Sequence, residues 1–376
     1  MPALLRLHLT DFRNFPAVEF APRSVGFNLL YGLNGSGKTS LIEAIYYLSF
    51  GRSFRSHLAS RIIRNNTEKF TIFAELSAHD GVRMPLGVER LLSGDLKIRI
   101  DGRDATSASE LADLTPVQLM NSQGFTLLDA GPLYRRKYLD WGLFYQSRDF
   151  LPIWKAYGQV LRQRNAALRS GTSSPKELAV WTQELYLKGL SLDQYRRNYI
   201  AALLPELTQT AAALLDLPQL KMAYYPGWDD SQNYLQILEN ATAKDRLLGF
   251  TQYGPHRADL KITINKVTAK DILSRGQQKL FVCAMILAQG AMLKSANKSP
   301  IYLIDDLPAE LDTISRNKLI ALLSKQETQV FVTAVEREAL DESLNGLPCT
   351  MFHVEHGCIT ELTPGKIEPI CDLIVE

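Results

Sequence analysis

The sequence predicts an α/β fold in which a helical lobe is inserted into one larger domain. Three stretches of the chain carry this prediction. Residues 1–130 contain mainly short segments in which apolar residues alternate with polar ones or run on unbroken, as in strands. Residues 131–250 contain long segments with apolar residues three and four positions apart, as in helices. Residues 251–376 combine both patterns, so we expect them to complete the domain that residues 1–130 begin.

The first part is expected to hold six strands and one helix. The helix should run from Thr39 to about Ser49, and the Asp101-Gly102 dipeptide marks a turn after the last strand. The predicted strands are LLRLHL, VEF, GFNLLY, FTIFAEL, RMPLGVER and LKIRI.

The middle part is expected to hold long helices over residues 132–147, 150–169 and 175–215. The third has a clear start, because Ser174 can cap it, Pro175 suits its first position and Glu177 can reach back to a free amide. In the last part we expect a strand over 260–267, a buried helix from about Ser274 and a buried strand at 301–305.

Residues 32–39, the phosphate loop, match the pattern G-x-x-x-x-G-K-[ST] between an apolar strand and a helix. Glycines let the backbone approach a phosphate, Lys38 can bridge the β- and γ-phosphates, and the Thr39 hydroxyl can bind Mg²⁺. A glycine-rich turn without a ligand would need neither the strand nor the helix. The expected nucleotide-binding residues are Gly32, Leu33, Asn34, Gly35, Ser36, Gly37, Lys38 and Thr39.

Two adjacent carboxylates, Asp305 and Asp306, end the strand predicted at 301–305. Buried strands seldom end in paired acids unless a cation lies nearby, although a solvated strand end is the alternative. We expect Asp305 to hold Mg²⁺ through a water molecule and Asp306 to orient or deprotonate the water that attacks the nucleotide.

The segment Leu273-Ser274-Arg275-Gly276-Gln277 opens the helix that precedes this strand. In this order, the phosphate loop, this segment and the two carboxylates resemble the ABC-type ATPases, whose signature motif has the form LSxGQ. The resemblance implies that Ser274, Gly276 and Gln277 contact the γ-phosphate of a nucleotide bound by a second copy of the chain. ATP and Mg²⁺ would then join two copies head to tail.

The same resemblance implies roles for other residues. Gln123 lies where the Q-loop glutamine of these ATPases would sense Mg²⁺ and water, and an ordinary surface glutamine is an equal alternative. Asp306 stands where many members have Glu, and Thr333 where many have a switch His. Both departures predict slow hydrolysis, since the shorter carboxylate and the weaker polar group would position water less well.

The length of the insertion narrows the choice among groups of ABC-type ATPases, because 233 residues, 40–272, separate Thr39 from Leu273. With Asp11 to Asn14 ending the first strand, the chain resembles an ABC-type (SMC/Rad50-like) P-loop ATPase head with an inserted α-helical lobe. In that group the loop holding Arg13 and Asn14 touches the nucleotide. Six blocks resemble the RecF family of bacterial recombination mediators: DFRNF, GLNGSGKTSLIEAIYYLSFGRSFRS, GFTLLDAGPLYRRKYLDW, QYGPHRADL, ILSRGQQKL and LIDDLPAELD.

Membership of that family would imply an ATP-dependent homodimer on double-stranded DNA with slow, DNA-stimulated ATP hydrolysis. It would also imply a part in recombinational repair and replication-fork maintenance, where RecA is loaded at single-strand gaps together with RecO and RecR. Two other functions stay open: a transport-energising ABC ATPase subunit, which the inserted lobe argues against, and a scaffold with permanently bound nucleotide. Phosphate release measured with and without duplex DNA would separate the scaffold from the other two functions.

The charge pattern offers a site for DNA. The chain carries 42 Lys and Arg against 40 Asp and Glu, so a polyanion must be attracted by a local patch. Residues 51–67 contain four arginines and no acid, which favours contact with a phosphate backbone, while a solvated surface is the alternative. The expected DNA-binding residues are Arg52, Arg55, Arg61 and Arg64.

Location and metal chemistry complete the expectations. The first residues lack the apolar core of an export signal, the longest apolar stretch is too short to span a bilayer, and the four cysteines form no Cys-x-x-Cys pair. We therefore expect a cytoplasmic, nucleoid-associated protein with no membrane partner. The cluster CTMFHVEHGC has the spacing of metal ligands, but its alternation favours a strand and a turn over a zinc site. The segment of His256 and Arg257 fits a phosphate contact and a structural turn equally well.

Overall fold

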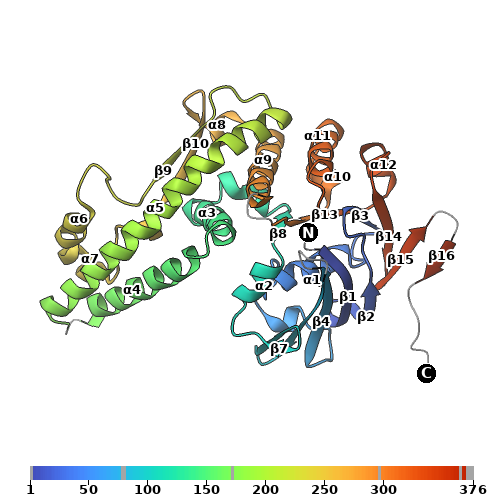
Figure 1. Cartoon of the computed structure of the whole chain (residues 1–376), viewed down its shortest axis with the longest axis horizontal. Helices are drawn as coiled ribbons and strands as arrows, with labels where there is room; N and C mark the ends of the chain where they lie inside the picture. The colour runs from blue at the N-terminus through green and yellow to red at the C-terminus, as the bar shows by residue number, and fades with distance from the viewer. Residues whose placement is uncertain (1–2, 78–81, 171–172, 295–297, 364–365, 370–376) are drawn as a thin grey trace. The chain divides into compact units, whose positions relative to one another are not determined.

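The computed structural model describes residues 3–77, 82–170, 173–294, 298–363 and 366–369 (Figure 1). The chain forms two compact units, one of Met1–Phe125 with Arg275–Glu376 and one of Thr126–Ser274. The lobe expected over 131–250 falls inside the second unit. That unit reaches on to Ser274 because a strand at Lys221–Tyr225 pairs with a later strand at Asp259–Ile264.

The first unit contains an antiparallel sheet of six strands in the order β2-β1-β4-β5-β6-β7. Five of the six strands predicted in the first part lie in it and are confirmed. An additional short helix, α2 (Ser109–Leu114), follows this sheet and was not predicted. The strands are β1 (Ala3–Phe12), β2 (Phe15–Phe20), β4 (Lys69–Ser77), β5 (Arg83–Leu91), β6 (Leu96–Ile100) and β7 (Arg103–Asp104).

A second sheet of the first unit has seven strands in the order β16-β15-β14-β3-β13-β12-β8. Its strands β14, β3, β13, β12 and β8 run parallel. Carboxyl ends of parallel strands meet at one edge of a sheet, so the segments after β3, β8, β12 and β13 come together there. The strands are β3 (Gly26–Tyr31), β8 (Val117–Met120), β12 (Ile301–Ile304), β13 (Gln329–Ala334), β14 (Cys349–Glu355), β15 (Cys358–Thr363) and β16 (Lys366–Pro369).

The helix after the phosphate loop, α1 (Lys38–Phe50), belongs to a hydrophobic core that takes side chains from both sheets. Phe12 and Phe70 of the antiparallel sheet and Leu303 and Phe331 of the parallel sheet are all fully buried in it. Because both sheets contribute, α1 is buried on nearly every side. This burial also removes a carboxylate, Glu43, from solvent.

The other helices of the first unit are η1 (Ala59–Arg61), α9 (Arg275–Lys294), α10 (Leu307–Glu310), α11 (Thr313–Ser324) and α12 (Glu338–Leu344). The predicted buried helix is confirmed in α9, whose residues from Leu280 to Gly290 are all buried. A short turn of helix, η2 (Gly124–Leu128), runs across the boundary of the two units.

The second unit contains the three predicted long helices, α3 (Pro132–Gln146), α4 (Phe150–Ser170) and α5 (Pro175–Leu214). The predicted cap is confirmed, since the Ser174 side chain accepts a hydrogen bond from the Glu177 amide at 3.1 Å. The remaining elements are β9 (Lys221–Tyr225), α6 (Tyr234–Asn240), α7 (Thr242–Leu248), η3 (Pro255–Arg257), β10 (Asp259–Ile264), β11 (Val267–Thr268) and α8 (Ala269–Ile272).

Two expectations for this part of the chain are wrong. The helical middle contains a strand, β9, which pairs with β10. The single strand expected over 260–267 is a hairpin of β10 and β11, because Asn265 and Lys266 adopt left-handed backbone angles, φ 48 and 67, and reverse the chain. Such a turn usually carries glycine, so nothing in the local residue pattern marked it.

A fully buried ion pair lies among α4, α7 and the segment after α7. Arg164 donates to Asp245 at 2.8 Å and to the Thr251 hydroxyl at 2.7 Å, and both charged side chains are 0% exposed. Arg164 Nε also donates to the Thr182 hydroxyl at 3.1 Å. The pair is therefore sealed in the core of the second unit.

The expectations about membranes and metals can be compared with the described residues. Within those ranges no helix combines the length and apolarity needed to cross a bilayer. The CTMFHVEHGC cluster forms the hairpin of β14 and β15 with its turn at His356, as the strand interpretation predicts. Across the described parts of the chain, no three His, Cys, Asp or Glu residues are placed to hold a metal ion. Cys371 lies outside the described residues.

Candidate nucleotide-binding site

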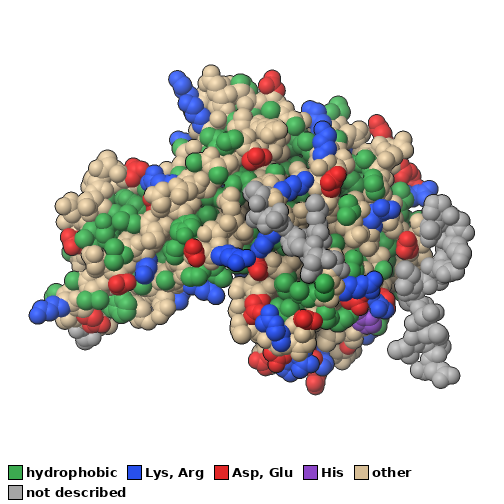
Figure 2. Space-filling model, viewed as in Figure 1, with side chains coloured by type: hydrophobic (Ala, Val, Ile, Leu, Met, Phe, Trp, Pro, Cys, Tyr) green, Lys and Arg blue, Asp and Glu red, His purple; other side chains and the backbone are tan. Residues whose placement is uncertain are grey.

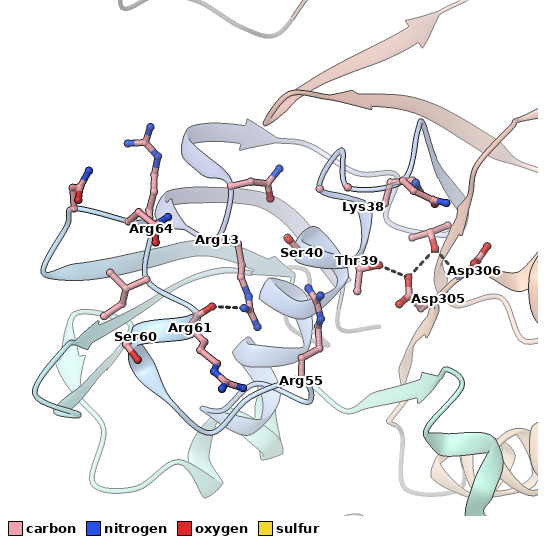
Figure 3. A pocket seen from close by; sticks show the side chains of 18 residues that line it. Arg13, Lys38, Thr39, Ser40, Arg55, Ser60, Arg61, Arg64, Asp305 and Asp306 are labelled. Carbon is pink, nitrogen blue, oxygen red and sulfur yellow. Dashed lines mark hydrogen bonds between the residues drawn. The ribbon is translucent and has the colours of Figure 1, made fainter.

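A pocket of about 930 Å³ opens in the first unit at the carboxyl edge of the parallel sheet (Figure 3). It is formed where the phosphate loop, the end of β1, the segment before β4 and the end of β12 meet. Its lining residues are Arg13, Asn14, Asn34, Gly35, Gly37, Lys38, Thr39, Ser40, Arg55, Ser60, Arg61, Ile63, Arg64, Asn65, Asn66, Asp305, Asp306 and Thr333.

The phosphate loop has backbone geometry that requires glycine. Gly37 lies at φ 123, and a Cβ there would come within 2.7 Å of the Asn14 amide nitrogen. The Asn14 amide in turn donates to the Ser36 carbonyl at 2.9 Å and fixes the loop against the end of β1. The Ser36 hydroxyl oxygen is shielded from solvent and has no hydrogen-bond partner among the described residues. An unpaired hydroxyl inside a glycine cradle fits a loop that binds phosphate oxygens.

Lys38 begins α1 and is mostly buried. Its amine donates to the carbonyls of Gly32 and Leu33 at 2.6 and 2.9 Å, so it lies folded within the loop. Burial lowers the pKa of the Lys38 amine, and the nearby carboxylates of Asp306 and Asp305 oppose that change. The amine therefore sits in a place where a phosphate would favour its charged form.

The sheet brings Thr39, Asp305 and Thr333 together, although they are far apart in the sequence. Figure 3 shows the Thr39 side chain joined to Asp305 by a hydrogen bond. The hydroxyls of Thr39 and Thr333 donate to the same oxygen of Asp305, at 3.0 and 2.9 Å. Burial raises the pKa of Asp305, while these two hydrogen bonds act in the opposite direction. A hydroxyl and a carboxylate so placed are the ligand types that hold Mg²⁺ beside a triphosphate.

Asp306 follows directly and is exposed at the pocket, with left-handed backbone angles of φ 54 and ψ 48. Its amide donates to the Thr333 hydroxyl at 2.7 Å. Thr333 thus joins both acidic residues, since it accepts from one and donates to the other. Its hydroxyl is engaged by the Asp305 carboxylate and the Asp306 backbone amide, which suits a positioning role better than that of a mobile switch.

Arg13 is placed at the pocket, but its guanidinium is largely engaged by the protein. It donates to the two oxygens of Glu43 at 2.9 and 2.6 Å, and its third nitrogen donates to the Arg61 carbonyl. Glu43 is 0% exposed and did not emerge from the sequence as a site residue. A signal existed, because this acid interrupts the apolar run Leu41-Ile42 and Ala44-Ile45 of a buried helix.

The four arginines expected to bind DNA separate into two groups. Arg55, Arg61 and Arg64 line the pocket, together with residues of the phosphate loop. Arg52 lies outside the pocket lining, is exposed and interacts with Tyr46. The DNA-binding assignment stays a prediction. On the face drawn in Figure 2, blue Lys and Arg side chains are interspersed with red Asp and Glu, as the net charge of +2 would suggest.

The other predicted site residues lie outside the pocket lining. Gln123 is exposed just beyond β8, and the end of β8 lies next to the Asp305 backbone, whose amide donates to the Met120 carbonyl at 2.9 Å. Gly276 and Gln277 are exposed in the first turn of α9, and Ser274 is the exposed last residue of the second unit. The signature segment spans the boundary of the two units, and its role stays a prediction.

Comparison with known proteins gives one consistent result. Residues 3–360 match the family described as the RecF/RecN/SMC N terminal domain. The "DNA replication and repair protein RecF" of Pseudomonas putida (strain W619) is 45% identical over 361 residues, covering 96% of this chain and 98% of the relative. The protein of the same name from Pseudomonas aeruginosa (strain LESB58) is 43% identical over 363 residues, covering 96% and 98%.

Solved structures agree on the fold. A structure of the recombination mediator protein RecF-ATP in the RecFOR pathway superposes with a TM-score of 0.85 at 24% identity, covering 96% of this chain and 98% of that one. The Smc head domain derived from Pyrococcus furiosus, bound to part of ScpA, has a TM-score of 0.58 at 15% identity and covers 96% and 97%. The predicted ABC-type, SMC/Rad50-like head fold is therefore confirmed.

Proposed function

Because the chain belongs to the RecF family of DNA replication and repair proteins, we propose that it is an ATP-dependent DNA-binding protein that acts as a recombination mediator. ATP would bind in the pocket of the first unit, and hydrolysis would be slow and serve as a switch. The observation that carries the proposal is the meeting of Thr39, Asp305 and Thr333 beside Lys38 at one sheet edge.

The charges of the pocket suit a nucleoside triphosphate. Lys38 and four arginines line it against two carboxylates, Asp305 and Asp306. A site with this excess of cations attracts a polyanion, and the carboxylates can be balanced by a divalent cation. Thr39 and Asp305 would hold Mg²⁺, which would neutralise charge on the β- and γ-phosphates.

Asp306 is the residue that we propose as the general base. It would accept a proton from a water molecule whose oxygen attacks the γ-phosphorus, while the bond from that phosphorus to the β,γ-bridging oxygen breaks and ADP leaves. Asp306 has a shorter side chain than glutamate, so the water would be held less well and hydrolysis would be slow. Gln123, at the end of the neighbouring strand, would assist in orienting water.

The pocket as described belongs to one copy of the chain. We propose that the signature residues Ser274, Gly276 and Gln277 of a second copy complete it, so that ATP stabilises a homodimer. Such a dimer would close on double-stranded DNA and at gap junctions, where it would act with RecR and RecO in loading RecA. The protein would then work in the cytoplasm, in association with the nucleoid.

A transport-energising ABC ATPase subunit is the second candidate function. The family relationship favours DNA repair, because the relatives of 43–45% identity are DNA replication and repair proteins. The transport alternative predicts co-purification with membranes and no ATP-dependent retention on DNA.

Two variants test the proposal. Lys38→Ala should weaken ATP binding by about a hundredfold, since it removes a charged partner of the phosphates. Asp306→Asn should bind ATP normally but hydrolyse it at least about a hundredfold more slowly, as expected for loss of a general base. Sedimentation with ATP, Mg²⁺ and duplex DNA should show dimers for Asp306→Asn and monomers for Lys38→Ala. Normal turnover by Asp306→Asn would remove Asp306 from this role.

A further inference from the structure

Glu43 is a carboxylate that the proposed hydrolysis does not use. It lies in α1, is 0% exposed and is flanked by buried apolar residues. A carboxylate buried in this way is strongly destabilising unless cations and hydrogen-bond donors surround it. Its partners are Arg13, Arg55 and the Ser53 hydroxyl. All three belong to segments that form or adjoin the wall of the pocket.

Arg13 is held firmly by this carboxylate. Two of its nitrogens meet the two Glu43 oxygens, in the paired geometry that makes arginine–carboxylate contacts strong. Its backbone has a left-handed φ of 56, and its amide donates to the Ile62 carbonyl at 2.7 Å. Arg13 therefore ties Glu43 to the segment of residues 53–64, called here the wall segment.

Arg55, in the wall segment, is held loosely. Its guanidinium is 3.5 Å from Glu43, it is 45% exposed and it lines the pocket. Its charge also acts on Asp305, whose pKa it tends to lower. Figure 3 shows the Arg55 side chain rising from its loop on the side of the pocket where Thr39 lies. Arg55 is thus placed between a buried carboxylate and the proposed position of the phosphates.

Ser53 fixes the start of the wall segment. It is buried, its hydroxyl donates to Glu43, and the same oxygen accepts from the amides of Arg55 and Ser56 at 2.8 and 3.0 Å. The Arg55 backbone is consequently anchored through Ser53 to Glu43, while the Arg55 side chain is 45% exposed.

We propose that Glu43 is a positioning residue of the nucleotide pocket, which fixes the wall segment through Arg13 and Ser53. It holds Arg55 loosely, so that Arg55 can leave Glu43 and pair with the phosphates of a bound nucleotide. The inference rests on the proposed function, because it requires the pocket to bind ATP. It goes beyond that function because it assigns a positioning role to a residue outside the pocket lining.

Charge and position predict opposite effects for Glu43→Gln. The substitution removes a negative charge near a site for an anion, so by charge alone ATP should bind more tightly. If Glu43 positions the wall segment, ATP should bind about tenfold more weakly, because the cations lose their placement. The measurement is the Kd of the full chain for ATP and for ADP in the presence of Mg²⁺. Glu89→Gln, at an acid paired with Lys69 on the antiparallel sheet, is the matched control and should leave both values unchanged.

A double-mutant cycle with Arg55→Gln tests whether bound phosphates replace Glu43 as the partner of Arg55. In the otherwise unchanged chain, Arg55→Gln should weaken ATP binding about tenfold, and in the Glu43→Gln background by less than about threefold. Should Glu43→Gln fail to fold, Ser53→Ala replaces it in the same cycle, with the same non-additive result expected. Additive losses, or Glu43→Gln binding ATP as well as the unchanged chain, would overturn this inference alone. Absence of ATP binding by the unchanged chain would instead overturn the proposed function.

Discussion

Two arginine–carboxylate pairs, one in each unit, use the same chemistry in different surroundings. Arg164 and Asp245 are both 0% exposed, and the Arg164 donors are taken up by side chains and a carbonyl of the second unit. Arg13 and Glu43 are 16% and 0% exposed and border a pocket that other cations share. An ion pair of the same chemistry can therefore serve a site or only the core, depending on whether a pocket lies beside it. The Arg164–Asp245 pair stabilises the core of the second unit, and the Arg13–Glu43 pair positions residues beside the pocket of the first.

The largest expected effect is the contribution of the sealed Arg164–Asp245 pair to the stability of the fold. Arg164→Ala would leave the Asp245 carboxylate buried without a counter-charge, so the free energy of unfolding should fall by about 3–5 kcal/mol. Affinity for ATP should stay unchanged in the fraction that remains folded. Urea denaturation followed by tryptophan fluorescence, with an ATP titration beside it, measures both.

Lys244→Ala is the control for that experiment, since Lys244 is exposed one residue before Asp245. It should change the unfolding free energy by no more than about 0.5 kcal/mol. If Arg164→Ala also stayed within that range, the sealed pair would not define the core as described.

The second expected effect is a loss of stability in acid, which we attribute to the buried His256 of the second unit. His256 donates from Nε2 to the Thr251 carbonyl at 2.9 Å and accepts at Nδ1 from the Tyr157 hydroxyl at 2.7 Å, and burial lowers its pKa to about 4. An unfolded histidine titrates near pH 6.5, so the unfolded state binds more protons between these values. The contribution of His256 to stability is complete above about pH 6.5 and is lost as the pH falls toward 4. It should amount to about 3 kcal/mol.

The measurement is the unfolding free energy of the unchanged chain and of His256→Gln from pH 7.5 to 4. The variant should be less stable at pH 7.5 and should lose less stability on acidification. Parallel curves for the two proteins would show that His256 does not titrate in this way.

The smallest expected effect lies at the pocket and has the opposite sign. Burial raises the pKa of Asp305, so its folded pKa lies above the unfolded value and its charged form destabilises the fold as the pH rises through that range. Asp305→Asn keeps an oxygen that can accept from Thr39 and Thr333. The unfolding free energy without nucleotide should therefore be equal or higher by up to about 1 kcal/mol at pH 7.

The same variant should lose Mg²⁺-dependent ATP hydrolysis, which an activity assay beside the denaturation curve would show. Asp104→Asn, at an exposed acid paired with Arg99, controls for the charge change and should affect neither property. A clear loss of stability in Asp305→Asn would mean that this carboxylate supports the fold and not only the site.

Local patterns predicted the elements that depend on neighbours in the sequence. The phosphate loop, the strand ending at Asp305 and the Ser174 cap each depend on residues a few positions apart. Partners far apart were harder to foresee. Arg55, Arg61 and Arg64 suggested a free basic surface, because Glu43 and Asp11, the acids that pair with Arg55 and Arg64, lie outside that stretch.

Glu43 shows a second limit of prediction from the sequence. Its carboxylate is buried only because two sheets cover α1, and no periodicity along one helix reveals a second sheet. The β10 and β11 hairpin shows a third, since its turn uses Asn265 and Lys266 where glycine would have marked it. For Glu43 and the arginines the information lay in contacts between distant segments, whereas the hairpin turn is local and was missed because it carries no glycine.

The central claim is that ATP is hydrolysed by two copies of the chain acting together. The most direct test is the rate of phosphate release per chain, measured with saturating ATP, Mg²⁺ and duplex DNA over a wide range of protein concentration. We predict that the rate per chain rises with concentration and then levels off as dimers become complete. A rate per chain that stays constant down to the greatest dilution would contradict the claim.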